Sequence, residues 1–170
     1  MDDKKERNCR FVNGTERFAY RAAAIIVEDG HVLLATNNVA DYYYTIGGAV
    51  HLGETAKEAV EREVFEESGL KYEVDRLVFV CENFFCDKSQ SILNSYDCHC
   101  LEFFYIMKPL GRKNDIKVTS ECVDGEEYAV WLPIDKISEY KVLPEFIADR
   151  LRSLPNCIEH IVIDDRSKVK

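Results

Sequence analysis

Three glutamates that lie close together, Glu63, Glu66 and Glu67, are the residues whose type and spacing most clearly indicate chemistry. On a helix with about 100° between successive residues, Glu67 lies about 40° to one side of Glu63 and Glu66 about 60° to the other. Ionised carboxylates this close repel one another, and either protonation or a divalent cation removes the repulsion. Because oxygen ligands suit Mg²⁺ or Mn²⁺, the cluster predicts a metal site. The competing interpretation is an ordinary acidic surface helix.

The helix that would carry these carboxylates is predicted to span residues 55–68. Thr55, followed three residues later by Glu58, has the spacing of a capping box, and Gly69 can end the helix in a left-handed conformation. Apolar side chains form a stripe on the same side as the glutamates, at Ala56, Ala59, Val60 and Val64. The carboxylates are therefore expected to face the rest of the protein, with Arg62 at their flank to brace one of them.

The segments that must position this helix are mostly predicted strands. Residues 22–27 and 31–35 are apolar runs around the turn signal Asp29-Gly30, so they are predicted to form a buried β-hairpin. Further strands are expected at residues 72–86, 98–107, 128–132 and 158–163, and a short helix at 143–153. Polar connections are expected at residues 37–46, 87–97 and 111–127. Together these elements predict an α/β fold, in which helices pack on a mixed sheet.

The length and charge of the chain narrow the class of protein. Its 170 residues suit one compact domain, with residues 1–18 as a polar leader and residues 19–170 as the domain. The formal net charge of −9 argues against a stable nucleic-acid complex, although a cation can still mediate contact with one small anion. No apolar run reaches the roughly 20 residues of a membrane span, so no membrane partner is expected.

The cysteines and the first ten residues indicate the cellular compartment in which the protein is expected. There are seven cysteines, an odd number, and no two have C-x-x-C spacing, so reduced thiols in a cytoplasmic protein are expected. The charged start, MDDKKERNCR, lacks the apolar stretch of a signal peptide, which agrees with this localisation.

The segment that contains the glutamates resembles the Nudix box, the sequence signature of the Nudix hydrolases. The signature is a glycine, five residues, a glutamate, seven residues, and then Arg-Glu-apolar-x-Glu-Glu-x-Gly-apolar. Every fixed position matches, at Gly48, Glu54, Arg62, Glu63, Val64, Glu66, Glu67, Gly69 and Leu70. The resemblance implies a MutT-like protein with a Nudix-type α/β/α sandwich and a central mixed sheet.

The resemblance also implies roles for these residues. The three glutamates would bind Mg²⁺ or Mn²⁺ together with the backbone carbonyl of Gly47. Glu63 or Glu66 would be the general base, with Glu67 mainly a metal ligand. The supporting residues within the box would be Gly48, Glu54 and Arg62. The chemistry agrees with these roles, because a divalent cation offsets the charge of a diphosphate and lowers the pKa of bound water.

Candidate site residues outside the fixed positions of the box are chosen by their place in the sequence. Some relatives add a glutamate from the loop before a tryptophan strand, and the glutamates that can supply an extra ligand or base here are Glu126 and Glu127, with Glu102 and Glu121 as competitors. Candidate substrate contacts are Tyr44, His51 and Phe84, for which packing against the sheet is the alternative. Ile46 stands where many relatives carry proline, and His51 where many carry an acidic residue, which weakens any transfer of substrate specificity.

The expected activity is hydrolysis of a phosphoanhydride bond in a small nucleoside diphosphate derivative. ADP-ribose, dinucleoside polyphosphates, nucleotide sugars and oxidised nucleoside triphosphates all remain open as substrates, and a homodimer remains open as the assembly. The alternative is a catalytically silent Nudix domain that senses a nucleotide or binds a protein. Silent members are expected to lose box glutamates, and this chain keeps all of them.

Overall fold

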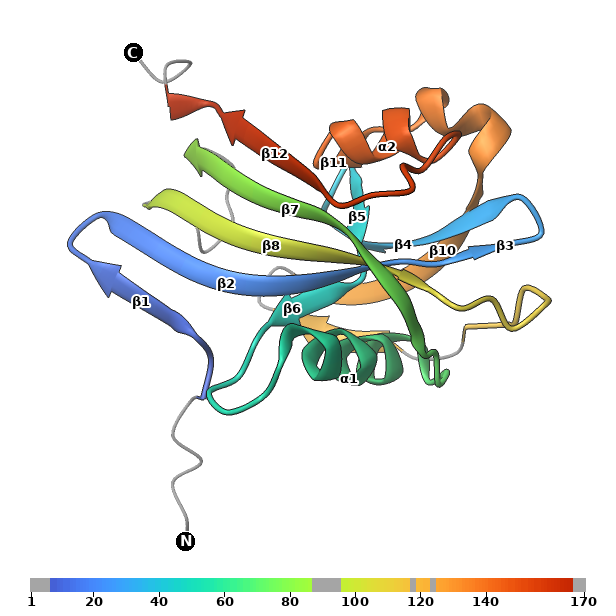
Figure 1. Cartoon of the computed structure of the whole chain (residues 1–170), viewed down its shortest axis with the longest axis horizontal. Coiled ribbons are helices and arrows are strands. Elements are labelled where there is room, and N and C mark those ends of the chain that lie inside the picture. Colours follow the sequence, from blue (N-terminus) through green and yellow to red (C-terminus); the bar gives the residue numbers. More distant parts are fainter. Residues whose placement is uncertain (1–6, 87–95, 117–118, 123–124, 167–170) are drawn as a thin grey trace, which may run out of the picture.

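The computed structural model describes residues 7–86, 96–116, 119–122 and 125–166. In this part of the chain, two six-stranded mixed sheets form the centre, and the helices α1 and α2 lie on opposite sides of them (Figure 1). This arrangement confirms the predicted α/β fold with a central mixed sheet.

The first sheet has the strand order β1-β2-β8-β7-β12, with β6 also paired to β2. Its strands are β1 (Arg10–Asn13), β2 (Glu16–Ile25), β6 (Gly47–Ala49), β7 (Val74–Cys86), β8 (Asp97–Met107) and β12 (Glu159–Asp164). The long strands β2 and β8 run parallel, while β7 and β8 run antiparallel. This sheet places β2 between β6, which precedes α1 in the chain, and β8.

The second sheet has the order β11-β5-β4-β10-β9, with β3 also paired to β4. Its strands are β3 (Val27–Glu28), β4 (His31–Asn37), β5 (Tyr43–Thr45), β9 (Thr119–Cys122), β10 (Gly125–Pro133) and β11 (Val142–Leu143). The helices are α1 (Ala56–Ser68), the 3₁₀ helix η1 (Ile134–Glu139) and α2 (Phe146–Arg150).

Most of the predicted elements have counterparts in the structure. The strands expected at 72–86, 98–107, 128–132 and 158–163 correspond to β7, β8, β10 and β12. The helix expected at 143–153 is shorter, because Leu143 pairs with Tyr44 in β11 and α2 begins only at Phe146. Parts of the expected polar connections are strand, namely β5, β9 and the start of β10. Residues 87–95 of another connection lie outside the described residues.

The hairpin predicted around Asp29 and Gly30 is much smaller than expected. Only Val27 and Glu28 pair with β4 across this turn, whose two central residues have positive φ angles of 47° and 72°. The preceding run, up to Ile25, belongs to β2 in the first sheet and pairs with β6 and β8. The turn and an antiparallel pair across it are therefore present, but the earlier part of the run takes other partners, because an apolar run shows that a strand is buried and not which strand it pairs with.

Part of the expected leader, residues 1–18, is strand as well. Residues Arg10 to Asn13 pair with the start of β2 across a turn in which Gly14 has a φ of 62°. The rings of Phe11 and Phe18 stack across this pair with centroids 5.5 Å apart. The described residues Arg10–Asn13 therefore extend the first sheet.

The local signals predicted for α1 are present. The Thr55 hydroxyl accepts a hydrogen bond from the Glu58 amide at 3.2 Å, and the Glu58 carboxylate accepts one from the Thr55 amide at 2.8 Å. Gly69 ends the helix with a φ of 72°. The buried residues of α1 are Ala56, Ala59, Val60, Val64 and Ser68. The helix is therefore fixed at both ends and packs by the predicted apolar stripe.

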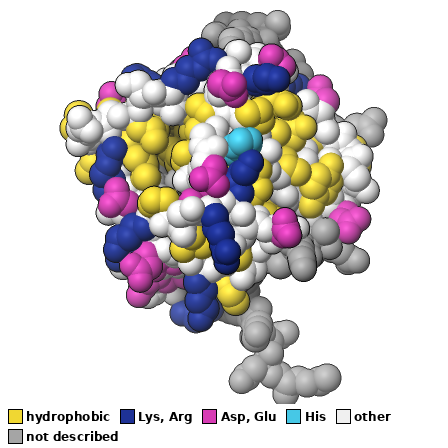
Figure 2. All heavy atoms as spheres, turned by 90° about the vertical axis from the view of Figure 1, so that its right-hand side faces the viewer, with side chains coloured by type: hydrophobic (Ala, Val, Ile, Leu, Met, Phe, Trp, Pro, Cys, Tyr) yellow, Lys and Arg dark blue, Asp and Glu magenta, His cyan; other side chains and the backbone are white. Residues whose placement is uncertain are grey.

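Two apolar clusters hold the layers together. One joins the buried face of α1 to Ala22 and Ala24 of the first sheet. The other lies under α2, where the Phe146 ring packs edge-on against Phe79 and Phe104, with centroids 5.2 and 5.5 Å apart. No helix in the described residues is long and apolar enough to cross a membrane. On the face shown in Figure 2, acidic and basic side chains are interspersed.

Candidate active site

The contact between β6 and α1 fixes the position of Glu63. A side chain at Gly48 would place its Cβ only 2.3 Å from Glu63 Oε1 and 2.4 Å from the carboxylate carbon. The Glu63 carboxylate thus lies directly over Gly48. The side chain of any larger residue at position 48 would occupy the space that this carboxylate fills. The close approach places Glu63 at the edge of the first sheet, where β6 pairs with β2.

Arg62 gathers three of the carboxylates. Its Nη1 donates to Glu63 at 2.7 Å and to Glu66 at 3.2 Å, and its Nη2 donates to Glu54 at 2.7 Å. Nη2 also donates to the Ala49 carbonyl at 3.1 Å, which ties the helix to β6. Although burial opposes the charge, the hydrogen bonds to Glu54 and Glu63 raise the pKa of Arg62 above its usual range. Arg62 therefore stays cationic and orders the box side chains.

Glu54 links the loop before α1 to this network. Its carboxylate accepts a hydrogen bond from the His51 amide at 2.7 Å as well as those from Arg62. Burial favours the neutral form, but these hydrogen bonds outweigh it and lower the pKa of Glu54. Glu54 thus braces the loop rather than facing Glu67, and the His51 ring lies beside it, with Nδ1 3.7 Å from Glu54 Oε1.

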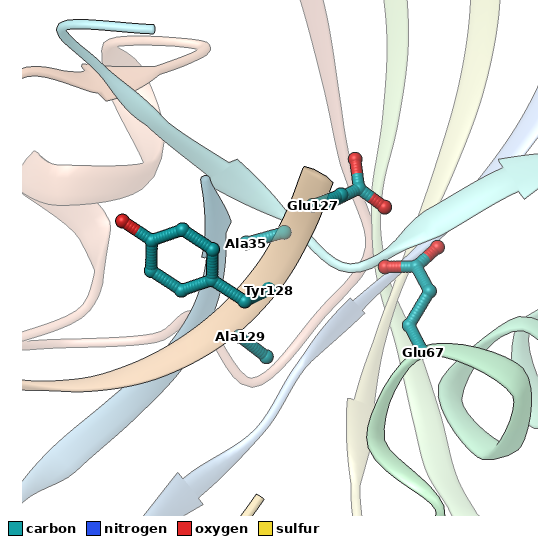
Figure 3. A pocket seen from close by; sticks show the side chains of 5 residues that line it. All are labelled: Ala35, Glu67, Glu127, Tyr128 and Ala129. Carbon is teal, nitrogen blue, oxygen red and sulfur yellow. The ribbon is translucent and has the colours of Figure 1, made fainter. Parts of the chain in front are cut away.

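Glu67 faces a carboxylate from the second sheet. Together with Glu127 it lines a small pocket, and the two carboxylates point toward one another (Figure 3). The Gly47 amide hydrogen-bonds to Glu67, and the Tyr44 hydroxyl donates to the Glu127 carboxylate. Burial, followed by the charges of Glu127 and Glu63, raises the pKa of Glu67 to about 9. The residue is therefore mainly neutral near pH 7 without a cation and is a carboxylate that a cation would stabilise.

Arg21 of β2 is a charged residue of this region that the sequence did not predict. Its Nε lies 3.1 Å from Glu102 Oε1, and its Nη2 donates to the Gly47 carbonyl at 3.4 Å. Burial raises the pKa of Glu102, and the nearby Arg21 and Asn83 partly offset that rise. The available signal was a lone arginine directly before the buried run that starts at Ala22.

Comparison with known proteins agrees with this geometry. Residues 18–155 match the family model of the NUDIX domain. The chain belongs to this family.

This Nudix chain is similar to several named proteins. It is 42% identical over 52 residues to the NAD-capped RNA hydrolase NudC of Haemophilus influenzae, covering 27% of this chain and 20% of that protein. It is 28% identical over 115 residues to an RNA pyrophosphohydrolase of Blochmanniella floridana, covering 59% and 73%. The MutT protein of Methanosarcina mazei Go1 has the same fold, with a TM-score of 0.58 at 20% identity over 90% of this chain and 96% of that one. The aligned segment thus spans about a fifth of the length of the first of these relatives.

The other candidate glutamates of the Nudix chain differ in how close they lie to Glu67. The Glu66 side chain is 56% exposed and reaches the network through Arg62. Glu126 is exposed and pairs in register with Glu121 of β9. Glu127 is therefore the candidate that the structure brings to Glu67, whereas Glu102 contacts Arg21.

Phe84 lies apart from these carboxylates. It is three residues along β7 from Cys81, which is the register partner of Glu102, so the alternation of a strand puts it on the opposite face of the sheet. There its ring stacks on His99 with a centroid distance of 4.2 Å, and the Arg166 guanidinium lies 4.2 Å from its centroid. Packing against the sheet, which was the alternative to substrate contact, therefore accounts for the contacts of Phe84.

The donor set of the Nudix box fits a hard divalent cation. Glu63 and Glu67 of the box, with Glu127 of β10, would offer such a cation oxygen ligands, and the cation would oppose the burial and the neighbouring negative charges that raise the pKa of Glu67. In the described residues, no three His, Cys, Asp or Glu side chains already form a metal-binding cluster. Arg62 donates hydrogen bonds to the carboxylates of Glu63 and Glu66, so we expect a bound metal ion to replace some of these hydrogen bonds.

The raised pKa of Glu67 predicts how the metal-free protein responds to pH. Its carboxyl ionises near the ordinary value of 4.5 when unfolded and near 9 when folded, so between these values the folded state holds more protons. The free energy of unfolding should therefore fall as the pH rises from about 5 to about 9. Glu67→Gln should remove this part of the slope and melt at a higher temperature than the wild type at the alkaline end.

Melting curves in excess chelator, recorded across that range for both proteins, measure the effect. Glu73→Gln, at an exposed glutamate outside the cluster, serves as the control and should keep the wild-type slope. Identical slopes for wild type and Glu67→Gln would show that Glu67 ionises normally in the fold.

Proposed function

We propose that this chain is a Mg²⁺- or Mn²⁺-dependent hydrolase that cleaves a phosphoanhydride bond in a nucleoside diphosphate linked to another group. The observation that carries the proposal is the complete Nudix box, together with Glu67 facing Glu127. A set of oxygen ligands with crowded negative charge needs a cation, and a diphosphate substrate needs the same cation to offset its own charge. Acidic side chains alone would repel such a substrate.

In the proposed reaction, water attacks one phosphorus of the diphosphate. A new P–O bond forms to the water oxygen, the bridging P–O bond breaks, and a carboxylate takes the proton that the water loses. The metal, when bound, lowers the pKa of water and offsets charge on the phosphate oxygens. Glu63 and Glu66 are the proposed bases, and Glu127, held by Tyr44, is the third candidate. Glu67 and the Gly47 carbonyl complete the proposed ligand set.

The proposed substrate is a small nucleotide derivative. The names of two relatives, a NAD-capped RNA hydrolase and an RNA pyrophosphohydrolase, support cleavage of a diphosphate attached to a nucleoside, and they add capped and 5′-phosphorylated RNA ends to the compounds worth testing. The net charge of −9 supports a small substrate rather than a stable nucleic-acid complex. We further propose a cytoplasmic location, which the free cysteines among the described residues support.

Activity is expected to depend on a divalent cation. A panel of ADP-ribose, dinucleoside polyphosphates, nucleotide sugars, nucleoside triphosphates and the two kinds of RNA end would be screened for product release with Mg²⁺. Excess chelator should abolish turnover of any substrate found, and Mg²⁺ or Mn²⁺ should restore it. Full turnover in chelator would exclude this mechanism.

Failure across the whole panel favours the alternative, a silent Nudix domain that binds a nucleotide or a protein. The melting temperature tests the metal site separately, because a ligand that binds only the folded state raises the melting temperature. A metal-stripped sample that melts at the same temperature with and without saturating Mg²⁺ would count against the proposed metal site. Homodimer formation remains a prediction that sedimentation can measure.

A further inference from the structure

Arg21 lies where a diphosphate next to the box carboxylates would need a cation. On β2 it pairs in register with Ala49 of β6 on one side and with Glu102 of β8 on the other. Its guanidinium contacts both neighbouring strands, with Nε 3.1 Å from the Glu102 carboxylate of β8 and Nη2 3.4 Å from the Gly47 carbonyl of β6. Gly47 is the same residue whose amide hydrogen-bonds to Glu67. Arg21 thus contacts one proposed metal ligand, the Gly47 carbonyl, and lies one residue away from a second, Glu67.

The two arginines of this region use their donors differently. Arg62 places all three guanidinium nitrogens on protein acceptors, namely Glu54, Glu63, Glu66 and the Ala49 carbonyl. Arg21 places Nε and Nη2 on protein acceptors, and its Nη1 has no hydrogen bond to any described residue. Its side chain is 34% exposed, whereas that of Glu102 is 13% exposed. Arg21 is therefore the guanidinium with a donor group and a surface left for a ligand.

Arg21 carries its charge into an acidic surrounding. Burial would lower its pKa, but the neighbouring carboxylates, Glu102 first and then Glu63 and Glu67, raise it. In turn, the charge of Arg21 is one of the influences that lower the pKa of Glu67. A guanidinium beside carboxylates that would hold a cation is suited to bind a doubly charged phosphate group.

A purely structural role explains these contacts less well. Strands β2 and β8 are already paired along the full length of β2, from Glu16 to Ile25, so one further ion pair adds little to their union. The hydrogen bond from Arg21 Nη2 to the Gly47 carbonyl is long, at 3.4 Å, so a phosphate oxygen could replace this carbonyl as the acceptor.

We propose that Arg21 binds the diphosphate of the substrate, with Glu102 orienting the guanidinium. The inference rests on the proposed hydrolase function and adds a substrate-binding residue outside the Nudix box. It uses the planar fork of arginine, which matches two oxygens of a phosphate at once and which lysine lacks.

The test compares Arg21→Gln and Arg21→Lys with the wild type. The probe is α,β-methylene-ADP in the presence of Mg²⁺, with the dissociation constant measured by calorimetry, and KM and kcat measured on the substrate found in the panel. Loss of a hydrogen bond to a charged group predicts binding weaker by on the order of 10- to 100-fold in Arg21→Gln, with a similar rise in KM. Arg21→Lys should fall between this variant and the wild type.

Lys57→Gln is the control, because it removes the same charge from an exposed position in the first turn of α1. It should bind the probe like the wild type. If Arg21→Gln does not fold, Arg21→Lys alone decides, since it keeps the charge and must still bind more weakly than the wild type.

The outcomes separate this inference from the proposed function. A wild type that hydrolyses its substrate while both Arg21 variants keep wild-type affinity and KM overturns the inference alone. A wild type that hydrolyses nothing in the panel and does not bind the probe overturns the proposed function and this inference with it.

Discussion

Glu67→Gln is expected to lower kcat by at least roughly 10–100-fold at low Mg²⁺ concentration while leaving the protein folded. The carboxamide keeps the size of the side chain but loses the charge that would hold the cation, and Glu67 is the buried carboxylate that faces Glu127. Folding should not suffer, because the change removes repulsion from the metal-free cluster. The measurement is steady-state turnover over a range of Mg²⁺ concentrations, with circular dichroism to verify the fold.

Glu→Gln variants at the other candidates then separate ligands from the base. Turnover lost with a ligand should recover in part at high Mg²⁺, whereas turnover lost with the general base should not. The variants to compare are Glu63→Gln, Glu66→Gln and Glu127→Gln, with Glu73→Gln as the exposed control. Hydrolysis in ¹⁸O-water should put label on a phosphate product in the wild type. Label on the organic product alone would mean attack at carbon, and wild-type turnover in all these variants would favour the silent domain.

The two glycines at the start of the box are expected to fail in different ways when each is replaced with alanine. A Cβ at Gly47 would lie 2.2 Å from the Ala22 carbonyl oxygen and 2.7 Å from the Ala23 Cα, at a φ of 150°. These are backbone atoms inside the first sheet and cannot move away cheaply. Gly47→Ala should therefore lower the free energy of unfolding by roughly 2–4 kcal/mol.

Gly48→Ala should instead lower turnover and leave the fold nearly as stable. Its Cβ would collide with the Glu63 carboxylate, the end of a flexible side chain that can swing away. The expected loss of stability is less than about 1 kcal/mol, but Glu63 leaves its place beside Arg62, so turnover should fall by at least about tenfold.

Denaturant unfolding and turnover, measured on the same samples, distinguish these two effects. Gly14→Ala is the control, because Gly14 has a positive φ of 62° but nothing within 4 Å of the added Cβ. It should show the cost of backbone strain without a collision. Equal stability of Gly47→Ala and Gly14→Ala would show that the sheet accommodates the extra atom.

The sequence by itself determined the helix and the identity of its chemical groups. The Thr55 and Glu58 cap, the Gly69 stop and the apolar stripe act over a few residues, so they can be recognised without the rest of the chain. The spacing of Glu63 and Glu67 likewise follows from one helical turn. The complete box then indicated the family to which the chain belongs.

The tertiary structure decided which distant groups meet these residues. Nothing local distinguishes Glu127 from Glu102, yet β10 brings Glu127 to Glu67, and β8 brings Glu102 to Arg21. The pairing of β2 with β6 and β8, rather than with β4, likewise placed Arg21 beside Gly47. Strand pairing is set by burial and hydrogen bonding between segments far apart in the chain, so an apolar run predicts a strand without naming its neighbours.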